Sequence, residues 1–477
     1  MGKNIKNILS CAAGAAMILG GLTACSGGGV YDGFEVPVQP ASTLSPVGDL
    51  YREELTQYGD EGTEDTVLAT FSSDNGACTI KKLTRYYDVT LDYENHSPAE
   101  AGRAYGEAIM KAFPDYHSVM EPYIYENIYS QLKDLTDDFS AVETRVFTMI
   151  DTLRDKDRDE LLAFAEEISG GVRGYAEDGV ISYEEALTFN LIPETLRGTA
   201  CSALSLWGEK TASGDPITVR LLDWHPGSNN QMGRAHAVIH ANKGEHSYTG
   251  ISFLGFSGIV SAINNDGVFA AILDVGSMNE EYSCEDRKCY TYDLKYALEE
   301  FGTAKEVGEF MVANSADYTW SHNLIISDKD HSYCAEDAVK QLQESGKGYS
   351  VLRDADTPLL SGIHWDNKDS LCVVNSFASE GNQDSFTGNA QNLVRFNKYN
   401  EWVASKDCFT VGELKTILTK EKVNQGLGKG EAAVQNVRRR GTVQMIIVDY
   451  HTGRIQVSFI SPEGASDEVV FTDVGTF

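Results

Sequence analysis

The segment 201–224 constrains the fold of this chain more than any other stretch. It begins with Cys201, passes through a polar turn that contains glycine and proline, and ends on Val-Arg-Leu-Leu-Asp-Trp. This pattern predicts two antiparallel strands, and alternate residues of such strands share one face. Arg220 and Asp223 can therefore return to the neighbourhood of Cys201. A thiol beside a guanidinium is a candidate nucleophile, because only the thiolate attacks and a nearby cation favours it.

The same segment resembles the start of the catalytic chain in N-terminal-nucleophile (Ntn) hydrolases of the linear-amide type. Choloylglycine hydrolases, acid-ceramidase-like amidases and acyl-CoA:6-aminopenicillanate acyltransferases typically begin Cys-Thr-Ser-Phe-Ala-x-Trp-Gly and continue to Gly-Arg-Asn-Leu-Asp-Trp. Here the two stretches read Cys-Ser-Ala-Leu-Ser-Leu-Trp-Gly and Val-Arg-Leu-Leu-Asp-Trp. A lone cysteine is more often a buried structural thiol, so the surrounding pattern is what favours a catalytic Cys201.

A second resemblance lies at 255–274, which looks like the family's Gly-x-Asn-x-x-Gly-Leu segment. Choloylglycine-type members carry an oxyanion-binding Asn at the place of Asp274. An ionised carboxylate cannot donate a hydrogen bond to an oxyanion, so Asp274 is expected to bind a substrate amine or to orient the α-amine of Cys201. Asn264 is the other candidate contact to substrate or oxyanion in this segment, although Asn264–Gly267 also fits a β-turn.

Two further motifs follow in the family's order. Val-Asn-Ser-Phe around Asn375 resembles Thr-Asn-His-Phe, whose Asn donates its amide to the developing oxyanion, and such a donor is usually worth ~3 kcal/mol. Gln-Asn-Leu-Val-Arg, ending at Arg395, resembles a Ser-x-x-Arg segment that brings an arginine near the nucleophile. The chain departs from the family at Ser376 and Asn392, where His and Ser are usual. A solvated helix arginine is the alternative interpretation of Arg395.

The resemblance implies a mechanism. The chain is expected to cut itself between Ala200 and Cys201, and the freed α-amine, with a pKa near 8 in reference peptides, then serves as general base. The Cys201 thiolate attacks the linear amide (C–N) bond of a small N-acyl substrate, Asn375 holds the oxyanion, and water resolves the thioester. The implied assisting residues are Arg220 and Arg395 for thiolate or substrate charge, and Asp223 for holding the α-amine.

Other functions stay open at this point. An acyltransferase would pass the acyl group to an amine, and a substrate-binding lipoprotein would never be cut. A conventional cysteine peptidase would need a histidine partner for Cys201, and no recognisable motif supplies one. Neither the motifs nor the resemblance requires a cofactor or metal. The formal net charge of −32 argues against nucleic acid as a partner.

The N-terminus has the pattern of a bacterial lipoprotein signal. Two lysines precede a short apolar stretch over 8–21, and Leu-Thr-Ala-Cys at 22–25 matches a lipobox. We therefore expect a signal peptide over 1–24, a lipidated Cys25, a flexible tether over 25–48, and a membrane-anchored extracytoplasmic protein. An ordinary secretory signal cut near Ala24 and a signal anchor are the alternatives.

The remaining chain divides at the nucleophile. Residues 49–200 are expected to form a mostly helical propeptide or α-chain region, and 201–477 the catalytic region. The fold class implied is α+β, a four-layer αββα Ntn-hydrolase sandwich preceded by a helical segment. Asp178–Glu185 mimics half of an EF-hand loop and is interpreted as a helix-capping turn. Cys284 and Cys289 bracket a short polar loop and are the first candidates for a disulfide.

Periodicity predicts the individual elements of the chain. Helices are expected after Ser97 and over 118–135, 139–154, 157–169, 183–189, 292–301, 304–313, 391–404 and 411–419. Strands are expected over 66–71, 85–91, 203–207, 217–222, 235–240, 247–253, 268–273, 322–327, 331–335, 350–352, 372–377, 443–450 and 454–460.

Overall fold

The computed structural model describes residues 58–131, 139–196, 199–275, 280–382, 390–419, 441–465 and 468–477. The expected signal peptide, the lipidation of Cys25 and the tether lie outside these ranges. Within them, no helix combines the length and the apolar character that a membrane crossing requires.

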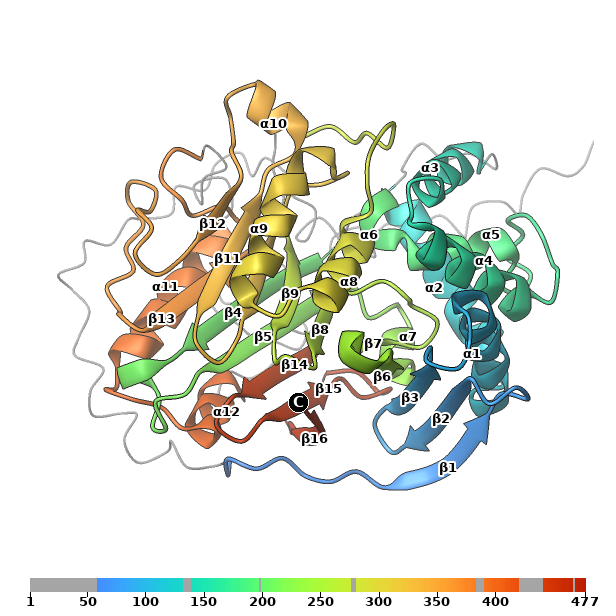
Figure 1. The fold of residues 1–477 in the computed structure, drawn as a ribbon, viewed down its shortest axis with the longest axis horizontal. Coiled ribbons are helices and arrows are strands. Elements are labelled where there is room, and N and C mark those ends of the chain that lie inside the picture. Colours follow the sequence, from blue (N-terminus) through green and yellow to red (C-terminus); the bar gives the residue numbers. More distant parts are fainter. Residues whose placement is uncertain are drawn as a thin grey trace, which may run out of the picture.

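The strands of the described residues form two sheets (Figure 1). The ten-stranded sheet has the order β1 (Val67–Ser72), β2 (Cys78–Leu83), β3 (Tyr87–Asp92), β6 (His236–Asn242), β7 (Tyr248–Phe253), β8 (Ser261–Asn264), β9 (Phe269–Asp274), β10 (His322–Ser327), β11 (Ser332–Asp337) and β12 (Val351–Arg353). The six-stranded sheet has the order β13 (Ser370–Val374), β4 (Thr199–Leu206), β5 (Ile217–Trp224), β14 (Thr442–Asp449), β15 (Arg454–Phe459) and β16 (Thr472–Thr476). Every neighbouring pair is antiparallel except β3 and β6.

The helices fall into two groups. The first precedes Cys201 in the chain and comprises α1 (Pro98–Ala112), α2 (Tyr116–Gln131), α3 (Ser140–Ile150), α4 (Asp155–Ser169), α5 (Tyr183–Asn190) and α6 (Ile192–Thr195). The second comprises α7 (Gln231–Arg234), α8 (Tyr290–Glu300), α9 (Ala304–Asn314), α10 (Lys340–Glu344), α11 (Ala390–Ala404) and α12 (Val411–Thr419). In Figure 1 helices α1 to α5 gather at one side of the molecule, beside β1 to β3.

The two sheets and the second group of helices build four layers. Apolar residues of α8 and α9 pack with one face of β9 and β10, including Ile272 and Leu324. Helices α11 and α12 pack with the outward face of β4 and β5, including Leu204 and Val219. The opposite faces of the sheets meet each other, because hydroxyls of β4 and β11 bond directly, with Ser205 Oγ and Ser332 Oγ 2.7 Å apart. This order is the αββα sandwich that the sequence predicted.

In the described part of 49–200, three strands precede the helices. Strands β1 to β3 belong to the ten-stranded sheet, which they join through the parallel pair β3–β6. The sequence prediction missed β2, where Lys81 and Lys82 interrupt the alternation of apolar residues. The first described residues of this region therefore extend the ten-stranded sheet, and its described helices lie within 98–195.

The predicted helix start after Ser97 and the predicted capping turn before α5 are both confirmed. Ser97 and Glu100 form a reciprocal capping box at the start of α1. Ser182 and Glu185 form another at the start of α5, directly after the stretch that mimics half of an EF-hand. Each serine satisfies a helical N–H that would otherwise lack a partner. The stretch 178–185 is thus a capping turn, as interpreted.

The predicted disulfide between Cys284 and Cys289 is wrong. Both cysteines are free thiols in the structure. Cys289 is the N-cap residue of α8 and is buried, with its Sγ 3.8 Å from the carbonyl oxygen of Met149 on α3. Its thiol packs into the interface between the two helix groups, whereas Cys284 stays half-buried. The sequence spacing carried no information about these opposite environments.

A buried ionic cluster joins α4 to α8. Lys295 is fully buried, and its Nζ lies 3.1 Å from Asp157 and 2.9 Å from Glu160. Flanking pairs are Arg154–Asp293 at 2.7 Å, Lys156–Glu299 at 2.5 Å and Lys243–Glu299 at 2.6 Å. The cluster connects residues on opposite sides of position 200. A buried cation of this kind is tolerated only because its carboxylates are present.

Replacing Lys295 tests the cluster. In a Cys201→Ala background, Lys295→Met leaves Asp157 and Glu160 buried without their cation, and we expect a loss of about 3–5 kcal/mol in the free energy of unfolding. Urea unfolding measures it. The matched control is Lys305→Met, which removes an exposed partner of Glu309 and should change stability by less than about 1 kcal/mol. Equal effects of the two substitutions would contradict a stabilising role for the buried cluster.

Acid stability provides a second test. Burial alone would raise the pKa of Glu299, but Lys243 and Lys295 outweigh it and lower this pKa from 4.5 to about 2. Because the folded-state pKa is depressed, the stabilisation is complete above pH 4.5 and is lost as the pH falls towards 2. We expect Glu299→Gln to flatten the pH dependence of unfolding in this window. The exposed substitution Glu309→Gln is the control, and equal slopes for both variants would refute the assignment.

Candidate active site

Cys201 lies on the inward face of the smaller sheet, completely buried. Strand β4 pairs with β5 so that Cys201 faces Leu222 and Ala203 faces Arg220. Alternation along β4 turns Leu204 and Leu206 outward to α11 and α12, so Cys201 and Ala203 point between the sheets. The alternating pattern of the sequence thus places the thiol in the layer between the two sheets.

Arg220 supplies the cation that the sequence predicted beside the thiol. Its Nη2 lies 3.3 Å from Cys201 Sγ and donates to the carbonyl oxygen of Ile272 on β9 at 3.0 Å. The guanidinium is fully buried, and within the described residues its Nε and Nη1 have no hydrogen-bond partner. Buried donors that lack a partner call for an explanation, and a catalytic role is one such explanation. The unsatisfied side of Arg220 is therefore suited to stabilising negative charge at this thiol.

The protonation state of Cys201 is set by opposing effects. Burial raises the pKa of the thiol above its ordinary value, Arg220 lowers it, and Asp223 raises it. The direction of the Arg220 effect agrees with the expectation, but burial is the larger influence. In the intact chain the thiol is therefore held in its neutral form, and the guanidinium is the main group that opposes this.

Asn375 stands at the end of β13, next to the nucleophile. Its Oδ1 accepts from the Cys201 N–H at 2.6 Å, and its Nδ2 donates to the main-chain oxygen of Asp274 at 2.6 Å. The amide is thus oriented with its acceptor toward the nitrogen that self-cleavage would release. Asp274 therefore contacts Asn375 through its main-chain carbonyl group, a contact that the sequence did not predict.

Arg395 is buried, so the alternative of a solvated helix arginine is wrong. Its Nη1 donates to the carbonyl oxygen of Cys201 at 2.6 Å, and its Nη2 donates to Asn375 Oδ1 at 2.8 Å. Nη1 also lies 3.6 Å from Asp223 Oδ2. Arg395 therefore contacts the main chain of Cys201 from the α11 side of the sheet, whereas Arg220 contacts its sulfur from the layer between the sheets.

Asp223 lies directly across from Ala200 in the β4–β5 ladder. Its Oδ1 accepts from Thr442 Oγ1 at 2.5 Å, and its Oδ2 faces Arg395. The carboxylate is buried and held from two sides, beside the residue that precedes Cys201. This placement brings Asp223 to the predicted cleavage position.

The structure places Asn264 in a different environment. Its Nδ2 donates to the carbonyl oxygens of Leu298 and Phe301, at 3.0 and 2.9 Å, and its Oδ1 accepts from the main chain of the β8–β9 turn. Both amide hydrogens are thus committed to the end of α8. Asn264 is a turn and packing residue here, which agrees with the β-turn alternative and gives no support to an oxyanion contact.

The sequence did not predict three residues that support the site. Asn392 donates to the Asn375 carbonyl oxygen at 2.8 Å, Asn323 donates to the main chain on both sides of Asn375, and Thr442 holds Asp223. The sequence indicated Asn392 only as a departure from the family's serine, and it predicted Asn323 only as part of a strand. Nothing in the local pattern singles out Thr442, because its role depends on strand pairing across 219 positions.

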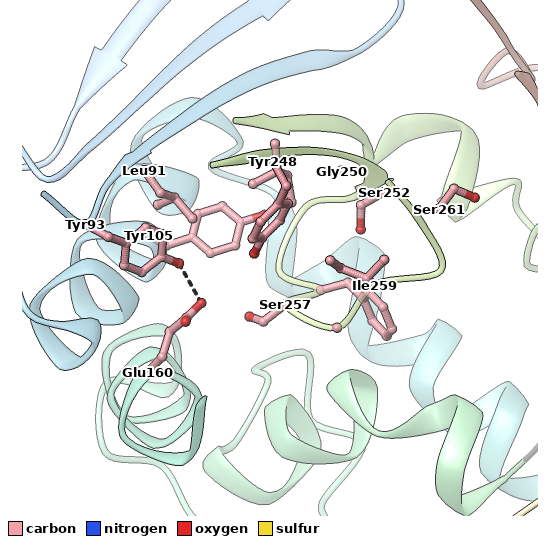
Figure 2. Close-up of a pocket in the computed structure, with 13 residues that line it drawn as sticks. Leu91, Tyr93, Tyr105, Glu160, Tyr248, Gly250, Ser252, Ser257, Ile259 and Ser261 are labelled. Atoms are coloured by element: carbon pink, nitrogen blue, oxygen red, sulfur yellow. Dashed lines mark hydrogen bonds between the residues drawn. The ribbon is translucent and has the colours of Figure 1, made fainter. Parts of the chain in front are cut away.

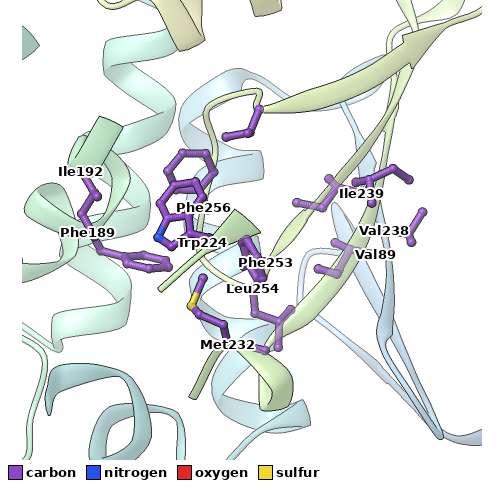
Figure 3. Close-up of a cluster of buried hydrophobic side chains, with 14 of the residues drawn as sticks. Val89, Phe189, Ile192, Trp224, Met232, Val238, Ile239, Phe253, Leu254 and Phe256 are labelled. Atoms are coloured by element: carbon purple, nitrogen blue, oxygen red, sulfur yellow. The ribbon is translucent and has the colours of Figure 1, made fainter. Parts of the chain in front are cut away.

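The tryptophan that closes the 201–224 motif belongs to the core. Trp224 lies 6.1 Å from Phe253 and 6.4 Å from Phe256, measured between ring centroids, and Phe256 contacts Phe189 of α5 (Figure 3). Burying such aromatic side chains contributes strongly to packing. Trp224 therefore packs the first helix group against the end of β5. It lies two residues beyond Leu222, which is the cross-strand neighbour of Cys201.

A cavity lies elsewhere, between α1, α4 and the strands β3, β6 and β7. It is lined by tyrosines, Glu160 and small residues, and Tyr93 donates to Glu160 there at 2.8 Å (Figure 2). None of its lining residues belongs to the group around Cys201. Among the described residues, no cluster of three or more His, Cys, Asp or Glu side chains is arranged to hold a metal ion.

No protein-family model and no curated protein matches the sequence. Solved structures similar to this chain include an N-acylethanolamine-hydrolyzing acid amidase ortholog from Caenorhabditis elegans, at 12% identity and a TM-score of 0.34, covering 55% of this chain and 93% of that chain. They also include a conjugated bile acid hydrolase variant from Clostridium perfringens (14%, 0.35, 57% and 92%) and penicillin V acylase from Agrobacterium tumefaciens (12%, 0.32, 57% and 86%). At these TM-scores we base the fold on the layers and strand order of this chain alone.

Removing Arg220 tests the electrostatics of the thiol. Arg220→Met takes away the cation that lowers the pKa of Cys201, so the thiolate fraction at a fixed pH should fall. We expect alkylation of Cys201 by iodoacetamide at pH 8, located by mass spectrometry, to slow by about tenfold or more, with a rate profile displaced to higher pH. Half-buried Cys284 is the internal control and should react unchanged. An unchanged Cys201 profile would show that the guanidinium does not act on the thiol.

Proposed function

We propose that this protein is an autoprocessed cysteine Ntn amidase that hydrolyses the linear amide (C–N) bond of a small N-acyl substrate. The observation that carries the proposal is the buried guanidinium of Arg220, which lies 3.3 Å from Cys201 Sγ with two further donors unsatisfied among the described residues. A cation placed in this way contributes little to packing, but it favours a thiolate and any anion that forms on attack.

Self-cleavage is the first reaction of the proposal. The Cys201 thiol loses its proton, its sulfur attacks the Ala200 carbonyl carbon, and the bond from that carbon to the Cys201 nitrogen breaks while the nitrogen takes up a proton. Water then hydrolyses the thioester, which frees the Ala200 carboxylate and restores the thiol. The position of Asp223 across from Ala200 supports this step, because a buried carboxylate beside the new α-ammonium favours its formation.

Substrate turnover repeats the chemistry on an external amide. The α-amine of Cys201 takes the thiol proton and passes it to the leaving amine, and water resolves the acyl thioester. The Oδ1 of Asn375 accepts from the Cys201 nitrogen in the intact chain, so it is placed to orient the α-amine. For Asn375 to bind an oxyanion as well, its Nδ2 must exchange the Asp274 carbonyl oxygen for that oxyanion.

Arg395 and Asp223 complete the proposed machinery from the other side of the sheet. Arg395 holds the carbonyl oxygen of Cys201 and the amide of Asn375 together, and this fixes the nucleophile relative to its neighbour. Positioning of this kind lowers the entropic cost of reaching the reactive geometry.

The N-terminal fragment is proposed to stay bound as a partner chain. Its strands β1 to β3 remain paired in the ten-stranded sheet, and the α4–α8 ionic cluster crosses the cut. We further propose that this fragment carries the lipid at Cys25 and holds the enzyme at an extracytoplasmic membrane surface.

Transfer of the acyl group to an amine, the alternative reaction, would need the same Cys201 thioester.

The intact mass and N-terminal sequence of the purified protein test the proposal. We expect fragments of about 19 and about 30 kDa, at ~110 Da per residue, with the larger one beginning at Cys201. Cys201→Ala should remain a single chain, whereas the control Cys284→Ala should be cut like the wild type. A wild-type chain that stays whole would overturn the mechanism and favour a substrate-binding protein that is never processed.

A further inference from the structure

Asn323 of β10 is completely buried and faces the smaller sheet across the layer that holds Cys201. Its Nδ2 donates to the carbonyl oxygen of Val374 at 2.9 Å and to that of Ser376 at 3.0 Å. These two residues flank Asn375. A single side-chain amide thus holds the main chain on both sides of the residue that contacts the nucleophile.

The neighbouring strand continues this attachment. Glu336 of β11 lies opposite Asn323 in the β10–β11 register. Its carboxylate accepts from the main-chain N–H groups of Ala378, at 2.9 Å, and Ser379, at 3.2 Å. The chain leaves the smaller sheet after Val374, so the strand ladder no longer fixes it at Asn375. Beyond that point, hydrogen bonds between the main chain and the side chains of Asn323 and Glu336 hold this segment in place of the strand ladder.

We infer that Asn323 is a positioning residue that sets the orientation of Asn375 toward the Cys201 nitrogen. The inference rests on the proposed function for its catalytic consequence, whereas the geometry of the contact is independent of it. A primary amide is required because one atom must donate two hydrogen bonds, which Asp and Ala cannot do. Without them, two buried carbonyl groups lose their donor and the main chain at Asn375 is free to shift.

The size of the expected effect follows from the geometry of attack. A displacement of about 1 Å at a reacting group costs on the order of 100-fold in rate. Asn323→Ala and Asn323→Asp should therefore slow self-cleavage by between 10-fold and 100-fold, timed by intact-mass spectrometry during refolding or cell-free synthesis. The matched control is Asn127→Ala, which removes a buried asparagine whose Nδ2 donates to Tyr123 within α2. This control should be cut at the wild-type rate.

A double-mutant cycle distinguishes positioning from general weakening. If Asn323 acts through Asn375, adding Asn323→Ala to an Asn375→Ala chain should slow self-cleavage no further than Asn375→Ala alone. Rate losses that multiply in the double variant would overturn the inference. A wild-type rate in Asn323→Ala would also overturn it.

Hydrogen exchange keeps the inference testable if the wild-type chain is never cut. In Cys201→Ala chains, the amide of position 201 still donates to Asn375, and adding Asn323→Ala should speed its exchange by about tenfold or more, whereas adding Asn127→Ala should not. An uncut wild type with this acceleration would reject the proposed function and retain the positioning role. Unchanged exchange would reject the positioning role, whatever the cleavage result.

Discussion

The contact between the Arg220 guanidinium and the Cys201 sulfur is the interaction on which the site depends. The pairing of β4 with β5 fixes this contact. Leu222 lies directly across from Cys201, and Arg220 is the next residue of β5 on the same inward face. Moving the register by one residue would place the two side chains on opposite faces of the sheet. A buried cation costs several kcal/mol unless an anion or dipole compensates, and here the thiol and one carbonyl oxygen are its hydrogen-bond partners in the described residues.

The same register explains why the site draws on so many distant segments. Both faces of β4 and β5 are covered, so Cys201 is contacted by Arg220 of β5, by Asn375 at the end of β13 and by Arg395 of α11. The first helix group closes the end of these strands through Trp224, and the ionic cluster fixes it to α8. The residues that contact Cys201 and the residues that hold the two regions together are therefore different sets.

The sequence predicted these strands and helices because alternation in β4 and β5 and the periodic runs at 304–313 and 391–404 are local properties, whereas the four layers were implied by the family resemblance. It also brought Arg220 to Cys201 by strand geometry, whereas Asn375 and Arg395 were reached only by resemblance. Alternation could not show that Asn375 turns its Oδ1 to the Cys201 nitrogen, or that both hydrogens of Asn264 are used by α8. Strand β2 and the separation of Cys284 from Cys289 also depend on long-range packing, which spacing does not encode.

In the proposed mechanism the Cys201 sulfur becomes acylated by an amide substrate. Mass spectrometry of the processed protein, acid-quenched during turnover of a mixture of N-acyl amides, would detect this acyl-enzyme. We expect an acyl mass increment on the larger fragment, mapped to Cys201 and sensitive to hydroxylamine, together with release of the free amine. Amide hydrolysis without an adduct at Cys201, or with an adduct at another residue, would contradict it.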